Sequence, residues 1–243
     1  MNNWQNDFFV GWSGRLPRRH KHFLRAAFAS VFLVFLLLGL ALARATDDPG
    51  SGVVDWDAGE KTFRGIATTQ PYPLLHLADG RTLMMSGPTQ VGPDLDPALD
   101  GKMVEATGVM MKRGTLDMLQ TNAPLHGVDG AGAPQKPVPL GRWRITGEIC
   151  DGKCYAGAMR PGAGIAHRAC ANFCLIGGVP PVFVSTAPVE GSSFMLLGNA
   201  AGGPLPDKLY DLAALRVQLE GDLERRGDLL VFKVDLSRAV VPW

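Results

Sequence analysis

The chain has 243 residues, with 24 lysines and arginines against 23 aspartates and glutamates, and a formal net charge of +1. A near-neutral balance without a basic stripe argues against nucleic acid as a partner. Glycine (30) and proline (18) are both abundant, which favours many short strands joined by turns over a helical bundle.

The first expected element is a transmembrane helix over residues 23–45. Its centre is the uncharged run AAFASVFLVFLLLGLALA, residues 26–43, which is about long enough to cross a bilayer core. Positive charge precedes this run at Arg15, Arg18, Arg19, Lys21 and Arg25. Because such charge stays in the cytoplasm, residues 1–22 are expected to form a cytoplasmic tail. The protein is then a single-pass protein of the inner (cytoplasmic) membrane with a periplasmic C-terminal part.

The competing interpretation of this segment is a signal peptide. The triplets ALA (residues 41–43) and ARA (residues 43–45) both fit the small-x-small cleavage pattern. The long segment before the apolar run and the length of the run itself favour an uncleaved anchor.

Two similar β-rich units follow a linker over residues 46–60. The first covers residues 61–126, a Gly/Pro linker covers residues 127–141, and the second unit covers residues 142–243. The run GRTLMMSG in the first unit corresponds to GSSFMLLG in the second, and a G-x4-RG hairpin recurs with identical spacing at Gly108–Gly114 and Gly221–Gly227. A unit of about five short strands suits a small barrel, whose closure removes exposed strand edges.

The strand order and the repeated hairpins resemble those of OB-fold-like domains in tandem. The predicted fold class is therefore all-β: an N-terminal transmembrane helix followed by two OB-fold-like small β-barrels, the second with a Cys/His-containing helical insertion at residues 150–178. Such barrels host several kinds of ligand, so the fold alone does not assign a function.

The insertion holds all four cysteines of the chain, as two C-x3-C pairs with His167 just before the second pair. The segment HRACANFCLIGG predicts a short helix that ends at Gly177–Gly178 and carries His167, Cys170 and Cys174 on one face. Because the first unit has no such insertion, the fold is not expected to need it.

Three interpretations of the cysteines remain open. Two disulfides among Cys150, Cys154, Cys170 and Cys174 would staple a long insertion in an oxidising compartment, with cross-pairing between the two C-x3-C pairs. A Zn or Cu site would use Cys154, His167, Cys170 and Cys174, since thiolates and imidazole suit these metals. A redox-active thiol would be favoured near a helix start beside His167, but no C-x-x-C motif is present.

The segment GEICDGKCYAGAMRPGAGIAHRACANFC resembles a cassette, GEIxDxKCYxGxMxPGxGxxHRxCAxxC, of uncharacterised membrane-anchored exported bacterial proteins. The resemblance implies that the cassette is a defined unit, and it implies no activity.

The sequence favours a non-catalytic role over an enzyme. It shows no paired-carboxylate spacing, Ser-His-Asp signature, phosphate-binding loop or dinucleotide motif. His76, alone on a strand, is expected to be a surface or half-buried residue, and the methionines of the first unit are expected to serve adaptable packing. The predicted function is a membrane-anchored, periplasmic and non-catalytic accessory or assembly subunit of a membrane redox or transport complex. Its insertion is expected to be stapled by disulfides, and its partners are the membrane and a protein. The alternatives are a periplasmic metal-binding protein and a thiol oxidoreductase.

Overall fold

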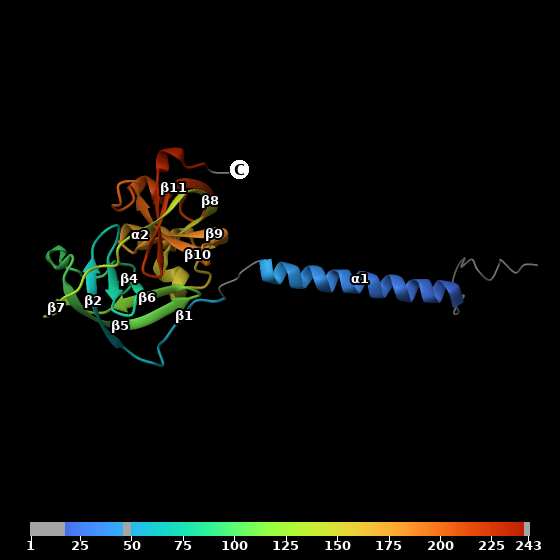
Figure 1. The fold of residues 1–243 in the computed structure, drawn as a ribbon, viewed down its shortest axis with the longest axis horizontal. Helices are drawn as coiled ribbons and strands as arrows, with labels where there is room; N and C mark the ends of the chain where they lie inside the picture. Colours follow the sequence, from blue (N-terminus) through green and yellow to red (C-terminus); the bar gives the residue numbers. More distant parts are fainter. Residues whose placement is uncertain (1–17, 46–49, 241–243) are drawn as a thin grey trace, which may run out of the picture. The chain divides into compact units, whose positions relative to one another are not determined.

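The computed structural model describes residues 18–45 and 50–240, and the chain divides into two compact units, Met1–Asp47 and Asp48–Trp243. Residues 1–17 of the predicted tail and residues 46–49 of the predicted linker lie outside the described residues. The described part of the first unit forms one helix, α1 (Arg18–Ala45) (Figure 1). Within the described residues, α1 is the one helix long and apolar enough to cross a membrane. It begins before the predicted residue 23 because arginine and lysine are good helix formers.

The second unit is mostly β. Its first seven strands are β1 (Val53–Val54), β2 (Lys61–Thr68), β3 (Leu74–Leu77), β4 (Thr82–Ser86), β5 (Met103–Arg113), β6 (Leu116–Thr121) and β7 (His126–Gly127). The next five are β8 (Val138–Asp151), β9 (Pro181–Val189), β10 (Ser192–Asn199), β11 (Arg216–Arg226) and β12 (Leu229–Val234). Short 3-10 helices are η2 (Pro97–Leu99), η5 (Asp207–Leu212) and η6 (Leu236–Arg238). Between β8 and β9 lie the π-turn η3 (Cys154–Ala158), the 3-10 turn η4 (Ile165–His167) and the helix α2 (Arg168–Ile176).

The strands pair in two rings. In the first sheet the order is β1-β5-β2-β3-β4-β6, and an additional pairing of β5 with β6 makes a ring of five paired strands, which is called the first barrel below. The second sheet is the closed barrel β10-β12-β11-β8-β9. When the five strands of each ring are counted in chain order, from β2 and from β8, the third pairs in parallel with the fifth. These pairs are β4 with β6 and β10 with β12. The duplicated strand order predicted from the sequence is thus present in the pairing.

The repeated hairpin has a steric origin. Gly114 and Gly227 occupy the turns after Arg113 and Arg226 with φ of 56° and 64°, a left-handed conformation that glycine adopts without cost. This conformation accounts for the Arg-Gly pair in both halves of the sequence.

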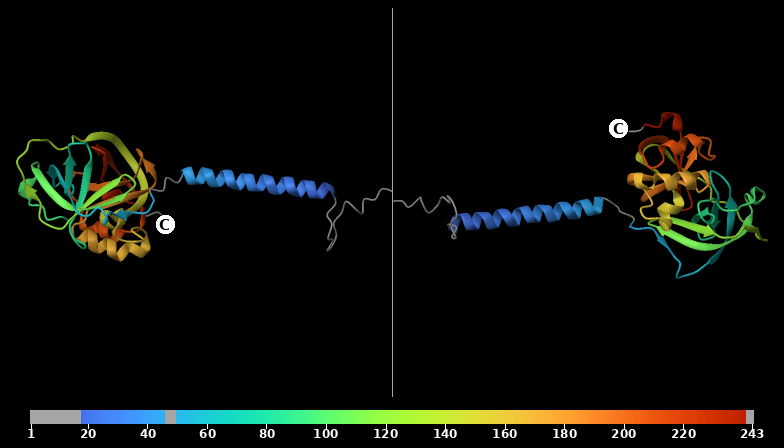
Figure 2. Two further views of the ribbon diagram at one scale, coloured as in Figure 1. Left: turned by 90° about the horizontal axis from the view of Figure 1, so that it is seen from below. Right: turned by 180° about the vertical axis from the view of Figure 1, so that it is seen from behind.

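One apolar cluster draws side chains from both barrels, whose ribbons lie side by side in two further views (Figure 2). The insertion contributes Tyr155 and Ala156 to it, and Tyr155 is only 2% exposed. The other members come from both barrels: Leu74, Met84, Met111, Leu116, Met118, Cys150, Val182, Phe194, Leu196, Leu229 and Val231. The insertion therefore contributes to the core between the barrels, and the expectation that the fold does not need it stays a prediction. The buried methionines agree with the expected packing role.

A second contact between the barrels surrounds His76. The backbone N–H of Thr82 donates to Asp228 Oδ1 (2.7 Å), and Thr82 Oγ1 donates to the carbonyl of Arg226 (2.9 Å). His76 is 3% exposed, and its ring nitrogens bond to Thr68 Oγ1 (3.0 Å) and Thr82 Oγ1 (3.3 Å). The expectation of a surface or half-buried histidine is wrong, because the sequence of one strand does not reveal that the other barrel packs against it. Burial, with the nearby charge of Arg226, lowers the pKa of His76 to about 4.

The low pKa of His76 predicts a loss of stability in mild acid. Below about pH 6.5 the unfolded chain binds a proton that folded His76 does not bind until the pH approaches its folded pKa of about 4. The free energy of unfolding should therefore fall as the pH falls through this window. Urea unfolding of the full chain in detergent, at pH 7.5 and at pH 5, would measure the loss, which should be smaller for His76→Gln. His126→Gln, at an exposed position, is the control, and equal pH dependence in all three proteins would contradict the prediction.

The shared core predicts that Tyr155→Ala destabilises both barrels together. Truncating a buried aromatic side chain costs about 3–5 kcal/mol. Phe173→Ala, at a position 64% exposed, should change stability by about 0.5 kcal/mol or less. Urea unfolding of the two variants would compare them, and equal effects would contradict the assignment of Tyr155 to a joint core.

Candidate metal centre

The ends of β8 and α2 position the cysteines. Cys150 is in β8, and Cys154 begins the turn η3 that follows it. Cys170 and Cys174 lie one turn apart on α2, whose last residue is Ile176 and whose cap is Gly177. The predicted helix and its end are confirmed. Its first turn differs, because His167 belongs to the preceding 3-10 turn.

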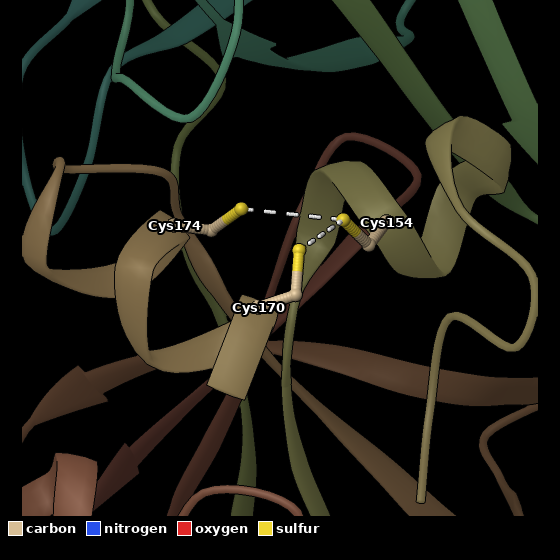
Figure 3. A group of neighbouring side chains, drawn as sticks. All are labelled: Cys154, Cys170 and Cys174. Atoms are coloured by element: carbon tan, nitrogen blue, oxygen red, sulfur yellow. Dashed lines mark hydrogen bonds between the residues drawn. The ribbon is translucent and has the colours of Figure 1, made fainter. Parts of the chain in front are cut away.

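Three sulfur atoms converge in the structure (Figure 3). Cys154 Sγ lies 3.8 Å from Cys170 Sγ and 4.0 Å from Cys174 Sγ. All three sulfurs lie within 4.8 Å of one another. Zinc–sulfur bonds of about 2.3 Å in tetrahedral geometry place sulfurs roughly 3.8 Å apart. The two distances from Cys154 therefore match those between ligands around one thiophilic cation.

The sulfur cluster is shielded on most sides. Cys154 and Cys174 are 5% and 1% exposed, and they pack with the fully buried Val179. Cys170 is partly exposed, and Gln90 of the first barrel donates a side-chain N–H to its sulfur at 3.5 Å. Cys170 is thus the sulfur that solvent reaches.

Lys153, which precedes Cys154 in the chain, forms hydrogen bonds with the loop after β4. Its ammonium group is buried and donates to the carbonyls of Gly87 (2.7 Å) and Thr89 (2.5 Å). Burial lowers the pKa of Lys153, while Cys174, Cys154 and Asp151 act in the opposite direction. The amino group of Lys153 therefore lies close enough to Cys154 and Cys174 to interact with them electrostatically.

His167 contacts Asp151, away from two of the three predicted thiol ligands. Its Nε2 is 2.9 Å from Asp151 Oδ2, and Asp151 Oδ1 accepts the backbone N–H of Cys154 at 2.8 Å. Asp151, Cys154 and His167 form a second group with ligand atoms within 4.8 Å of one another. The predicted set of four ligands is therefore split, with Cys154 common to both groups. The Nδ1 atom of His167 is buried and has no hydrogen-bond partner among the described residues.

Cys150 is separate from the sulfur cluster. It is 1% exposed, belongs to the core between the barrels, and its thiol donates to Glu148 Oε1 at 3.2 Å. All four cysteines are free thiols in this structure. The expected cross-paired disulfides are absent from it, since the nearest sulfurs are 3.8 Å apart and a disulfide bond is about 2.05 Å long.

The surroundings of the thiols disfavour bare thiolates. The pKa of Cys154 is raised by its hydrogen bond with Cys174 and by burial. Burial also raises the pKa of Cys170, and it raises that of Cys150, with Glu148 adding to the effect. Reactive cysteines show the opposite shift. A bound cation reverses this balance, because a coordinating thiol is deprotonated.

Sequence reasoning missed three polar contributors to this site. Asp151 and Lys153 flank Gly152 in the stretch between Cys150 and Cys154, and charges so close to cysteines were an available signal. Gln90 belongs to the other barrel, and nothing in its local sequence marks it.

Comparisons with known proteins do not assign the chain to a family. No family model, curated protein or solved structure matched it.

Differences in burial predict the order in which the thiols react. Cys170 should be alkylated first, because it is the most accessible of the four, and Cys150 and Cys174, each 1% exposed, should be alkylated last. Timed iodoacetamide labelling of the metal-free chain in detergent, read by peptide mass spectrometry, would give the order. A disulfide-linked peptide pair, or labelling of Cys150 as fast as Cys170, would contradict the structure.

Proposed function

We propose that this chain is a membrane-anchored metal-binding protein whose insertion holds one thiophilic cation through Cys154, Cys170 and Cys174. The observation that supports this most directly is the convergence of three sulfurs at 3.8 and 4.0 Å. Thiolates select Zn²⁺ and Cu(I) among biological cations. The raised pKa values of the thiols weigh against the thiol oxidoreductase alternative.

The buried charges favour Zn²⁺ over Cu(I). Three thiolates carry one net negative charge with Zn²⁺ and two with Cu(I), and the buried carboxylate of Asp151 adds one more in either case. The ammonium group of Lys153 offsets one of these charges, so Cu(I) leaves one more negative charge uncompensated than Zn²⁺ does, and uncompensated buried charge is costly.

His167 is the proposed fourth ligand. A metal-binding histidine commonly donates its other ring nitrogen to a carboxylate, which fixes the tautomer. Asp151 is such a carboxylate at Nε2, and Nδ1 is the buried nitrogen without a partner among the described residues. Coordination of one ion by all four residues would require His167 to come closer to Cys170 and Cys174.

The location proposed for this function is the outer face of the inner membrane. The apolar helix α1 supports an anchor, and the basic residues at its start support a cytoplasmic N-terminus. The equal strand order of the two rings, with third and fifth strands parallel, supports OB-fold-like barrels in tandem. The resemblance of the insertion to the exported bacterial cassette remains part of this proposal.

A second candidate function is the accessory or assembly subunit of a membrane complex. The insertion presents three large apolar side chains, Ile165, Phe173 and Ile176, each 64–65% exposed. Apolar side chains gathered on one short segment are typical of a protein contact. A membrane partner that co-purifies in stoichiometric amount with the wild type, and is lost with Phe173→Asp, would support it. A monomer in mild detergent would count against it.

Substitution of single cysteines tests the metal site. The metal-free chain in detergent should bind about one Zn²⁺, and Cys154→Ser, Cys170→Ser and Cys174→Ser should each abolish tight binding, because each removes a ligand. Cys150→Ser is the matched control, since this cysteine lies outside the cluster, and it should bind normally. Zinc content after dialysis and titration against a chromophoric chelator provide the measurements. Absence of binding by the wild type, or an equal loss with Cys150→Ser, would reject the proposal.

Cobalt substitution tests the coordination number. If His167 is the fourth ligand, Co²⁺ should show the strong visible absorption of a tetrahedral site with three sulfurs and one nitrogen. His167→Ala should then lower Zn²⁺ affinity and change the spectrum. An unchanged spectrum would leave three thiolates as the protein ligands and reject His167.

Lys153→Met should weaken Zn²⁺ binding by about 10- to 100-fold, the size of effect seen when outer-shell partners are removed. The variant removes the compensating charge and the tie to the loop at Gly87 and Thr89. Lys102→Met, at an exposed position, is the control. Equal Zn²⁺ affinity in both variants would show that Lys153 serves the fold alone.

A further inference from the structure

A small cavity near the two barrels' junction is independent of the thiols. It has a volume of about 240 Å³ and is lined by Ser51, Arg113, Tyr155, Arg160 and the Gly/Pro-rich loop over residues 157–163. This volume lies below the roughly 300 Å³ at which pockets for drug-sized ligands begin. The cavity therefore suits a ligand smaller than a drug-sized molecule.

Arg113 contributes an unused hydrogen-bond donor. Its guanidinium group lies over the Tyr155 ring, 4.3 Å from the ring centroid. Its Nε is buried and has no hydrogen-bond partner, and the structure shows no ion pair for this residue among the described side chains. A buried donor left unsatisfied costs about 1–3 kcal/mol, so an acceptor at this point would be stabilising.

Arg160 adds a second positive charge to the same cavity. One of its nitrogens, Nη2, donates to the carbonyl of Gly52 at 3.2 Å, which fixes the side chain. No carboxylate lines the cavity among the described residues. A nearby carboxylate, Glu148, already accepts from the thiol of Cys150 and from the backbone N–H of Gly164. The two guanidinium groups thus share no acidic partner in the cavity.

A larger cavity of about 620 Å³ also includes Ser51 and Arg113. Besides Arg113, the basic side chains there are Lys61, Arg81 and Lys112. Unlike those of Arg113 and Arg160, their charges are matched by ion pairs with Asp55, Asp79 and Asp117. The unmatched positive charge is therefore concentrated in the smaller cavity.

We propose that the cavity between Arg113 and Arg160 binds a small oxyanion, a phosphate or carboxylate group, through the two guanidinium groups and the hydroxyl of Ser51. Planar guanidinium donors match such anions in geometry as well as in charge. Because the larger cavity shares Ser51 and Arg113 with this site, the anion can carry an organic substituent.

Calorimetry with the full chain in detergent tests this site. Inorganic phosphate and phenyl phosphate, titrated at constant ionic strength, should both give saturable binding to the wild type. Arg113→Gln and Arg160→Gln should each weaken binding about tenfold or more, since hydrogen bonds to charged groups contribute about 1.5–3 kcal/mol. Arg64→Gln is the control, because Arg64 is exposed and paired with Glu105, and it should bind as the wild type does.

Each outcome decides the proposal. Tighter binding of phenyl phosphate would show that the anion is an organic ester that reaches the larger cavity, and equal binding would restrict the site to the anion itself. If Arg113→Gln does not fold, Arg160→Gln decides alone. No saturable binding to the wild type, or unchanged affinity in Arg160→Gln, would overturn the proposal.

Discussion

The apolar cluster that joins the two barrels is the constraint on which the rest of the structure depends. It draws side chains from both barrels and from the turn that begins at Cys154. Because Tyr155 is held in this core, the neighbouring Lys153 and Cys154 are held with it, one donating to the loop after β4 and the other facing Cys170 and Cys174. Hydrophobic burial thus positions polar groups that have little packing of their own.

Much of the fold could be predicted from local patterns. The apolar run, the repeated strand order and the short helix before Gly177 each follow from periodicity, glycine conformation or capping, which act over a few residues. The contribution of Tyr155 and Ala156 to the core between the barrels could not, because the first unit has no matching segment with which to compare them. His76 was misjudged for the same kind of reason, since its burial comes from the β11–β12 turn of the other barrel.

The residues of the candidate site could likewise be predicted only in part. Spacing along the chain identified the residues Cys154, Cys170 and Cys174, and helical geometry placed the last two on one face. It also placed His167 among them, whereas the structure pairs His167 with Asp151. Which cysteine stands apart, and which groups lie around the sulfurs, depends on contacts between segments distant in sequence. Gln90 and Cys170 are the clearest example.

The loop that Lys153 holds has a consequence for biogenesis. Gly87, Thr89 and Gln90 come from the first barrel, whereas the sulfurs come from a segment that leaves and re-enters the second. Contacts of such long sequence separation form late in folding. The complete sulfur cluster therefore forms only after both barrels have folded and docked, so an ion bound there would stabilise only the fully folded molecule. Since a ligand that binds only the native state stabilises it in proportion to the logarithm of its concentration, the concentration of free metal around the protein would then set how much of it stays folded.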